Sequence, residues 1–394
     1  MKKLIKTIFL TFLLFIISGN LFAEIIIQED MKLVPNPAIT KFNLAGDKME
    51  PDDFIKAALI ASGVPDNKIP AYLKRVNEIY NDYVLYRTTK NTQLNDAEAG
   101  ILYLYDKDIL IEYEENQTYL DKLLDTGYYN CVSSAILYMY MMKRKGFKVI
   151  ANETPTHVFC TVLDNGKEVD VETTNPFGYK PGQQIKVTSS SGKKYSPFIA
   201  PGAYDERKKI SGRRLIATIY SNRIVYLTKE DNINKEEILQ LALDATELQL
   251  NTKEALQDLF FNAGNVMYYL CNEDKYLEAM YVSKAIQDKY AKYGKSQLML
   301  NNTGYAFRKQ AVSKPDDHEY FEKLILNYGQ YLSKEDYDEF YEIYVYNKVI
   351  DLYWAGSYLE AKELLYKGLD RLTFSKSLRD LELQLQNDEN FKDN

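Results

Sequence analysis

The stretch from Gly127 to Pro176 constrains the fold of this chain most, because it combines clear helix signals with a hairpin pattern. Asn130 is a favoured N-cap residue, and Gly146 can take the left-handed conformation that ends a helix. Basic residues in the turn before Gly146 suit the negative end of the helix dipole. We therefore predict a helix that begins at Cys131 and ends before Gly146.

Beyond Gly146 the hydrophobic period changes from that of a helix to two, the period of a strand. The sequence predicts three strands, at residues 148–152, 157–163 and 168–174. The last two flank an Asn165-Gly166 hairpin signal. If the turn centres there, Phe159 faces Glu172, and His157 shares their side of the hairpin. The stretch therefore predicts an α+β fold in which a helix packs on an antiparallel sheet.

A cysteine at the first position of a helix lies at the positive end of the dipole, which favours the thiolate nucleophile. Free N–H groups there can also hold an oxyanion. A histidine within reach transfers the proton, and a carboxylate orients the histidine. The candidate catalytic residues are Cys131, His157 and Glu172. Asp170, further along the same strand face, is the alternative carboxylate.

Other interpretations of these residues remain open. Cys131 and Cys160 could form a disulfide, or Cys131 could be a small buried helix residue. We expect Cys160 to lie in the core, and Cys271 and His318 to be incidental. With three widely spaced cysteines and two histidines, the chain has neither a zinc pattern nor a histidine-rich metal site. We expect no metal and no cofactor.

The N-terminal residues 1–23 resemble a cleaved signal peptide, with a basic start, an apolar run and a small residue at Ala23. The apolar run is shorter than the roughly 20 residues that span a bilayer. We expect an exported protein, periplasmic or secreted, without a stable membrane span. Cleavage removes three lysines and no acid, so the formal charge falls from −7 to −10. Such an acidic protein is a poor candidate for binding nucleic acid.

The rest of the chain suggests a further domain order. Residues 24–50 are predicted to be an extended entry segment, 51–180 the domain that carries Cys131, and 181–211 a loop or linker. Residues 212–394 are predicted to be all-helical and repetitive. Tyr276-Leu277-Glu278-Ala279 recurs as Tyr358-Leu359-Glu360-Ala361. A weaker copy begins at Tyr320, so the steps are about forty residues, typical of paired-helix repeats.

This C-terminal pattern resembles tetratricopeptide repeats. Such arrays present a concave groove that binds peptides or protein segments. The alternative is a helical domain that only braces the first one.

Three motifs resemble those of the transglutaminase-like superfamily. They are the run Tyr119–Ala135 around the cysteine, His157-Val158-Phe159, and Val171–Pro176 around Glu172. The resemblance implies a papain-like α+β core and acyl transfer through a thioester on Cys131, with a peptide or isopeptide amide as substrate. The chain departs from the family at Phe159, where tryptophan is frequent, and at Glu172, where aspartate is frequent. Since some members are inactive, the alternative function is an envelope protein-binding module that acts through its helical repeats.

Overall fold

The computed structural model describes residues 33–42, 49–89, 94–181, 204, 206–315, 317–388 and 391. The predicted signal peptide and most of the predicted linker at 181–211 lie outside these residues. The fold is α+β, because a large set of helices accompanies one two-stranded and one four-stranded sheet. The chain divides into two compact units, Val34–Asn262 and Ala263–Asn394, which we call the sheet unit and the helical unit. The division falls within helix α10 (Lys253–Asn272).

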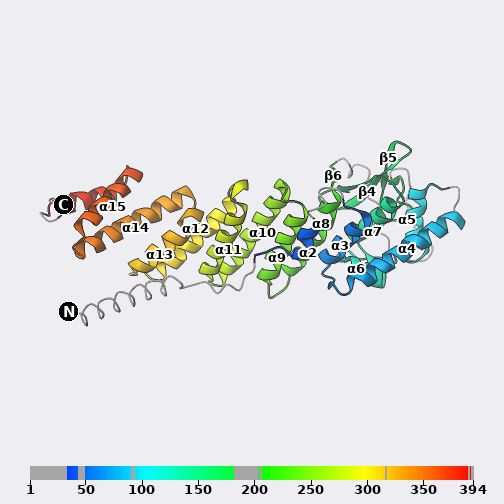
Figure 1. Cartoon of the computed structure of the whole chain (residues 1–394), viewed down its shortest axis with the longest axis horizontal. Coiled ribbons are helices and arrows are strands. Elements are labelled where there is room, and N and C mark those ends of the chain that lie inside the picture. Colours follow the sequence, from blue (N-terminus) through cyan, green and yellow to red (C-terminus); the bar gives the residue numbers. More distant parts are fainter. Residues whose placement is uncertain are drawn as a thin grey trace, which may run out of the picture. The chain divides into compact units, whose positions relative to one another are not determined.

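The sheet unit contains both sheets and the helices around them (Figure 1). Its helices are α2 (Pro37–Thr40), α3 (Pro51–Ala61), α4 (Ile69–Thr89), α5 (Asp96–Asp106), α6 (Leu120–Thr126), α7 (Cys131–Arg144), α8 (Gly212–Leu227) and α9 (Lys235–Leu248). Its strands are β1 (Glu112–Tyr113), β2 (Tyr128–Tyr129), β3 (Val149–Glu153), β4 (Val158–Asp164), β5 (Lys167–Val171) and β6 (Lys208–Ile210).

Helix α7 is the central element of the sheet unit, and the predicted helix from Cys131 is confirmed. The Asn130 side chain accepts from the N–H groups of Val132 and Ser133, and the Ser133 hydroxyl accepts from the Asn130 N–H, which forms a capping box. All residues from Cys131 to Met142 are buried. Helices α3, α5, α6 and α8 contact α7, as do strands β3 and β4. Burial on every side explains why its apolar residues follow no single stripe.

The four-stranded sheet has the order β5-β4-β3-β6 and is antiparallel throughout. The predicted hairpin register is confirmed, because Leu163 pairs with Glu168 and Thr161 with Asp170. Asn165 and Gly166 both have positive φ, as a tight hairpin turn requires. Strand β6 pairs with β3 and forms one edge of the sheet, although its residues lie in the segment predicted to be a loop.

Both faces of the β4–β5 hairpin are buried away from the turn, while Leu163 and Glu168 next to the turn are exposed. One face carries Val158, Cys160, Val162, Val169 and Val171, which alternate toward the core under α7. The other face carries Phe159 and Thr161, which are buried as well. The polar face that holds His157 is therefore covered rather than open to water.

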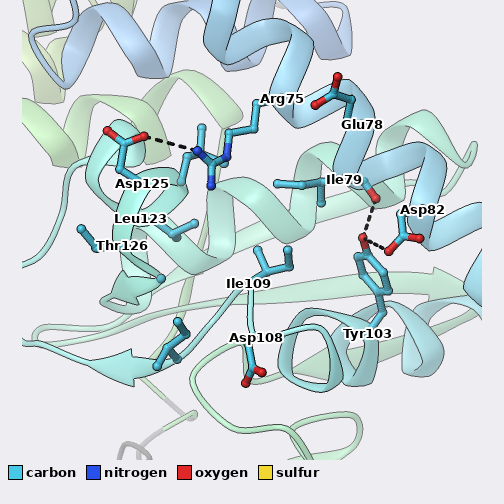
Figure 2. A pocket seen from close by; sticks show the side chains of 13 residues that line it. Arg75, Glu78, Ile79, Asp82, Tyr103, Asp108, Ile109, Leu123, Asp125 and Thr126 are labelled. Carbon is cyan, nitrogen blue, oxygen red and sulfur yellow. Dashed lines mark hydrogen bonds and ion pairs between the residues drawn. The ribbon is translucent and has the colours of Figure 1, made fainter.

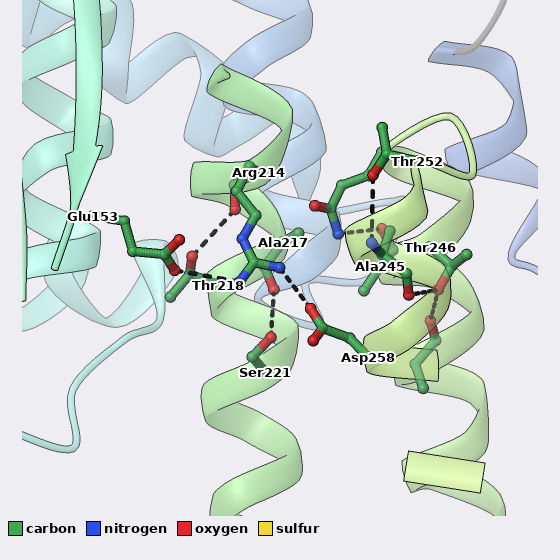
Figure 3. A network of polar contacts seen from close by, with 12 residues as sticks. Glu153, Arg214, Ala217, Thr218, Ser221, Ala245, Thr246, Thr252 and Asp258 are labelled. Atoms are coloured by element: carbon green, nitrogen blue, oxygen red, sulfur yellow. Dashed lines mark hydrogen bonds and ion pairs between the residues drawn. The ribbon is translucent and has the colours of Figure 1, made fainter. Parts of the chain in front are cut away.

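An ion-pair network ties the sheet to the helices that follow it (Figure 3). Arg214, in the first turn of α8, lies 3.3 Å from Glu153 at the end of β3 and 2.7 Å from Asp258 in α10. Its guanidinium is three-quarters buried, which reduces screening of both pairs by water. Arg214 therefore joins the last residue of β3 to α8 and to the part of α10 that belongs to the sheet unit.

The helical unit consists of successive helices that pack in pairs, including α11 with α12 and α14 with α15 (Figure 1). Its elements are α11 (Tyr276–Tyr290), η4 (Ala291–Tyr293), α12 (Gln297–Val312), α13 (His318–Tyr328), η5 (Gly329–Tyr331), α14 (Lys334–Trp354), α15 (Tyr358–Arg371) and α16 (Lys376–Leu385). Tyr276 and Tyr358, the first residues of the repeated motif, each begin a helix. The alanines of the two copies, Ala279 and Ala361, are completely buried. Among the described residues, no helix combines the length and apolarity that a membrane crossing needs.

Candidate functional site

The segment before α7 places Cys131 at the first position of the helix, where its side chain is 9% exposed. The chain leaves α6 through Gly127, whose φ of 75° is left-handed, and then pairs β2 with β1. A side chain at Gly127 would also meet Ile111. Asn130 then caps α7 and occupies the N–H groups of Val132 and Ser133. Within the described ranges, the N–H of Cys131 has no acceptor, so it remains available to a ligand.

His157 lies one residue before β4, and the structure brings it to both Cys131 and Glu172. Its Nε2 atom is 2.7 Å from Glu172 Oε2, and the Cys131 side chain lies close enough to raise the pKa of His157. Glu172 thereby occupies Nε2 and leaves Nδ1, the other ring nitrogen, for a different partner. The Thr154 N–H donates to the His157 carbonyl over 2.8 Å, which holds the turn before the strand. The structure therefore brings the three predicted residues together, with His157 hydrogen-bonded to Glu172 and close to Cys131.

Glu172 is buried at 2% exposure, yet both of its carboxylate oxygens have partners. Oε1 accepts from the Thr174 N–H at 3.0 Å and from the Thr174 hydroxyl at 2.7 Å. Oε2 accepts from His157 and from the Tyr204 hydroxyl, which is 3.4 Å away. Burial raises the pKa of Glu172, but the bonds from His157 and Thr174 outweigh it, so the pKa is lowered. The carboxylate is therefore charged at neutral pH.

The same partners determine the protonation of His157. Burial lowers its pKa, but hydrogen bonds to Cys131 and Glu172 and the negative charge of both outweigh this effect. The pKa rises to about 10. Since the free imidazole titrates near 6.5, this histidine stays protonated across the neutral range.

The loop that follows Glu172 is tied directly to the cysteine helix. The hydroxyls of Thr173 and Ser134 in α7 are 2.8 Å apart, and the Tyr105 hydroxyl donates to the Thr173 carbonyl over 2.9 Å. The loop also folds tightly on itself, because the Glu172 N–H donates to the Gly178 carbonyl. A Cβ at Gly178 would lie 1.8 Å from the Glu172 carbonyl oxygen, so only glycine fits there.

Asp170, the alternative carboxylate, has other partners. Its Oδ2 pairs with Arg207 at 2.5 Å, and its Oδ1 accepts from the Thr161 hydroxyl at 2.7 Å. Asn152 extends this chain by donating to the Thr161 hydroxyl. Among the described residues, Asp170 makes no contact with His157 or Cys131 that would let it serve in place of Glu172.

Comparison with models of known protein families, with curated proteins and with solved structures gives no match. The site must therefore be interpreted from its own geometry.

Two tyrosines that the sequence did not predict, Tyr113 and Tyr226, lie near enough to the thiol to interact with it electrostatically. Tyr113 in β1 pairs with Tyr129 in β2, and their rings are 5.9 Å apart. Burial raises the pKa of Tyr113, and the nearby Cys131 adds to the effect. The same two causes, together with Tyr119, raise the pKa of Tyr226 to about 12. The sequence does not predict the pairing of β1 with β2, because each strand is only two residues long and the two pair in parallel across α6.

The remaining cysteines and the second histidine lie elsewhere. All three cysteines are free, so the disulfide between Cys131 and Cys160 considered above is not formed. Cys160 is fully buried and directs its thiol to the Ala135 carbonyl, as expected of a core residue. The reason is register, since Cys160 points from the apolar face of β4 while His157 belongs to the other face. His318 pairs with Asp351 in the helical unit.

A cavity of about 650 Å³ lies beside the segment that leads to Cys131 (Figure 2). Its wall includes Arg75, Asp82 and Asp125, but none of the three candidate catalytic residues. Arg75 pairs with Asp125 at 3.5 Å, and Asp82 accepts from the Tyr103 hydroxyl. Within the described residues, no cluster of three or more His, Cys, Asp or Glu side chains could hold a metal ion. Arg75, Asp82 and Asp125 in this wall therefore already have polar partners.

Proposed function

We propose that this protein is an exported cysteine hydrolase or acyltransferase of the transglutaminase-like type, with a papain-like core, acting on peptide or isopeptide amides. The observation that carries the proposal is the hydrogen bond between His157 and the buried Glu172 carboxylate, with the Cys131 side chain close to His157. A thiol at a helix start, an imidazole and a buried carboxylate are the three groups that nucleophilic acyl transfer requires. The signal-like N-terminus supports export.

In the first half of the reaction, the Cys131 sulfur attacks the amide carbonyl carbon and forms a carbon–sulfur bond. The imidazolium of His157 then donates a proton to the amide nitrogen, and the carbon–nitrogen bond breaks. The amine leaves and a thioester remains. Glu172 stabilises the imidazolium and holds the ring through Nε2, which leaves Nδ1 for the sulfur.

In the second half, His157 removes a proton from water or from an acceptor amine, which attacks the thioester carbonyl. The carbon–sulfur bond breaks, and the sulfur leaves as thiolate. Water yields the carboxylic acid, and an amine yields a new amide. The same residues therefore support hydrolysis and transfer, and access of water to the thioester decides between them.

The oxyanion needs donors near the sulfur. The unoccupied Cys131 N–H is one such donor. The Tyr113 hydroxyl is the best side-chain donor for a second bond, since it has no hydrogen-bond partner among the described residues and lies near the thiol. Each such donor typically contributes a factor of about 100 to 1,000 in rate.

The test is the reaction of the purified chain with a thiol-directed electrophile such as iodoacetamide, followed by peptide mapping. Cys131 should react at least about 100-fold faster than Cys160 and Cys271, which are buried away from His157. Cys131→Ala should remove the fast phase and any amidase activity. Equal labelling of the three thiols in the folded protein would exclude the proposal.

Protein binding through the helical unit is the second candidate function, and exposed apolar side chains support it. On α12, Leu298, Tyr305 and Val312 repeat every two turns and are 37%, 50% and 64% exposed. An apolar stripe on one helix face is typical of a contact surface. Replacing Tyr305 and Val312 with serine should abolish capture of a partner from an envelope extract, while Cys131→Ala should not. The opposite result would exclude this candidate.

A further inference from the structure

Tyr204 is the only described residue between 181 and 206, and it contacts the proposed catalytic pair directly. Its hydroxyl donates to Glu172 Oε2 over 3.4 Å, and this oxygen also faces His157 Nε2. Its ring is 6% exposed and meets the Phe159 ring edge-on, with centroids 4.5 Å apart. Tyr204 therefore lies on the polar face of the hairpin, against the back of the proposed triad.

Arg207 fixes Tyr204 in this position. Its guanidinium carbon is 5.9 Å from the centre of the Tyr204 ring and 5.6 Å from that of Phe159. The same guanidinium pairs with Asp170, and the Arg207 N–H donates to the Tyr204 carbonyl. Strand β6 begins at the next residue and pairs with β3. The tyrosine is thus anchored by the sheet that it covers.

We propose that Tyr204 is a positioning residue for the triad, which holds the Glu172 carboxylate on His157 and excludes water from behind it. This inference rests on the proposed function. Without the hydroxyl, Oε2 would keep a single hydrogen bond, from His157. A buried carboxylate can hold an imidazole in one orientation only if its remaining lone pairs are occupied.

The Tyr204 hydroxyl also weakens the electrostatic effect of Glu172 on His157, because a hydrogen-bond donor to a carboxylate offsets part of its negative charge. The other titratable groups near this pair are the Cys131 thiol and the Tyr113 hydroxyl, while the Cys160 thiol interacts with Glu172 from the opposite face of β4. Asp170 and Arg207 lie behind Tyr204 and offset each other. A change at the hydroxyl should therefore appear in the titration of His157.

The experiment is a pH titration of the full chain labelled with ¹³C-histidine and followed by NMR. The chain has only two histidines, so His318→Gln assigns the second resonance. In Tyr204→Phe, which keeps the ring on Phe159, the pKa of His157 should rise by about half a unit. Tyr179→Phe is the matched control, since it removes a buried hydroxyl bonded to Asp164 and Asn95 instead and should leave His157 unchanged.

A second variant keeps the proposal testable if Tyr204→Phe does not fold. Site-specific 3-fluorotyrosine at position 204 keeps the shape of the side chain but donates a stronger hydrogen bond, so it should lower the pKa of His157. Shifts of opposite sign in the two variants would support the proposal. An unchanged His157 titration in the folded variants would overturn it. Because the titration needs no turnover, it separates this inference from the proposed function, which fails if Cys131 is unreactive.

Discussion

The two histidines of this chain each pair with a carboxylate, one in the sheet unit and one in the helical unit. His157 and Glu172 are 2.7 Å apart, and their side chains are 9% and 3% exposed. His318 and Asp351 are 3.1 Å apart, and their side chains are 38% and 48% exposed. The nitrogen–oxygen distances of the two pairs are similar, so a close histidine–carboxylate pair does not by itself indicate a catalytic site.

The difference lies in the surroundings of each pair. Glu172 receives three hydrogen bonds besides that of His157, and the far side of His157 meets a thiol. The pair of His318 lies in water, where solvent and salt screen the attraction. In the buried pair, both oxygens of the Glu172 carboxylate accept hydrogen bonds, so the carboxylate holds the protonated imidazole in one orientation. The exposed pair lacks these surroundings. The predictions below test this comparison.

The largest expected effect is on thiol reactivity. Glu172→Gln should slow the alkylation of Cys131 at neutral pH by roughly 100-fold, because a neutral amide does not stabilise the imidazolium that pairs with the thiolate. Asp351→Asn, the matched change in the helical unit, should leave the rate unchanged. Both rates are measured by quenching the alkylation at successive times and quantifying the labelled Cys131 peptide by mass spectrometry. Similar rates in the two variants would remove the distinction between the pairs.

The next effect concerns the loop that holds Glu172. Gly178→Ala should reduce the free energy of unfolding of the sheet unit by about 3 kcal/mol, because its Cβ would overlap the Glu172 carbonyl. Gly294→Ala in the helical unit is the control. Unlike Gly178, it has a positive φ of 94°, but nothing lies within 4 Å of its Cβ position, so the substitution should cost only backbone strain of about 1 to 2 kcal/mol. Urea unfolding measures both. Equal losses would mean that the loop can move aside.

The pH dependence of stability should also separate the two histidines. The pKa of His157 is raised in the folded state to about 10, from about 6.5 in the unfolded chain. Its stabilising contribution is therefore complete below about pH 6.5 and is lost as the pH rises through about 10. His157→Gln should remove this loss, whereas His318→Gln should not. Unfolding midpoints between pH 6 and 10.5 provide the measurement, and parallel curves for all three proteins would contradict the prediction.

The smallest effect is expected for the exposed pair. Asp351→Asn should change the free energy of unfolding by no more than about 0.5 kcal/mol, because an exposed ion pair gains little over its interactions with water. Thermal unfolding at low and high salt tests this. A loss of about 2 kcal/mol would show that the helical unit depends on its histidine more than its exposure suggests.

Much of the local structure followed from nearest-neighbour signals. Asn130 and Gly146 delimit α7, and Asn165-Gly166 determines the hairpin register that aligns Phe159 with Glu172. These signals work because caps and tight turns depend on a few adjacent residues. They were enough to nominate Cys131, His157 and Glu172 as residues that share one place.

The surroundings of that place could not be predicted in the same way. The hairpin placed His157 on the same side as Phe159 and Glu172, but it did not show that Phe159 is buried against Tyr204 and Arg207. Tyr204 reaches Glu172 from 32 positions away, and no local periodicity marks it. Tyr113 reaches the thiol through a strand pairing of two residues.

The amino-acid order thus specified a capped helix, a hairpin and three polar side chains directed to a common edge, since each depends on interactions over a few residues. The packing of distant segments decided the rest. It determines which carboxylate contacts His157, which hydroxyls donate to the oxygens of that carboxylate, and how far the pair is shielded from water. These properties depend on burial, and burial is created only when the segments meet.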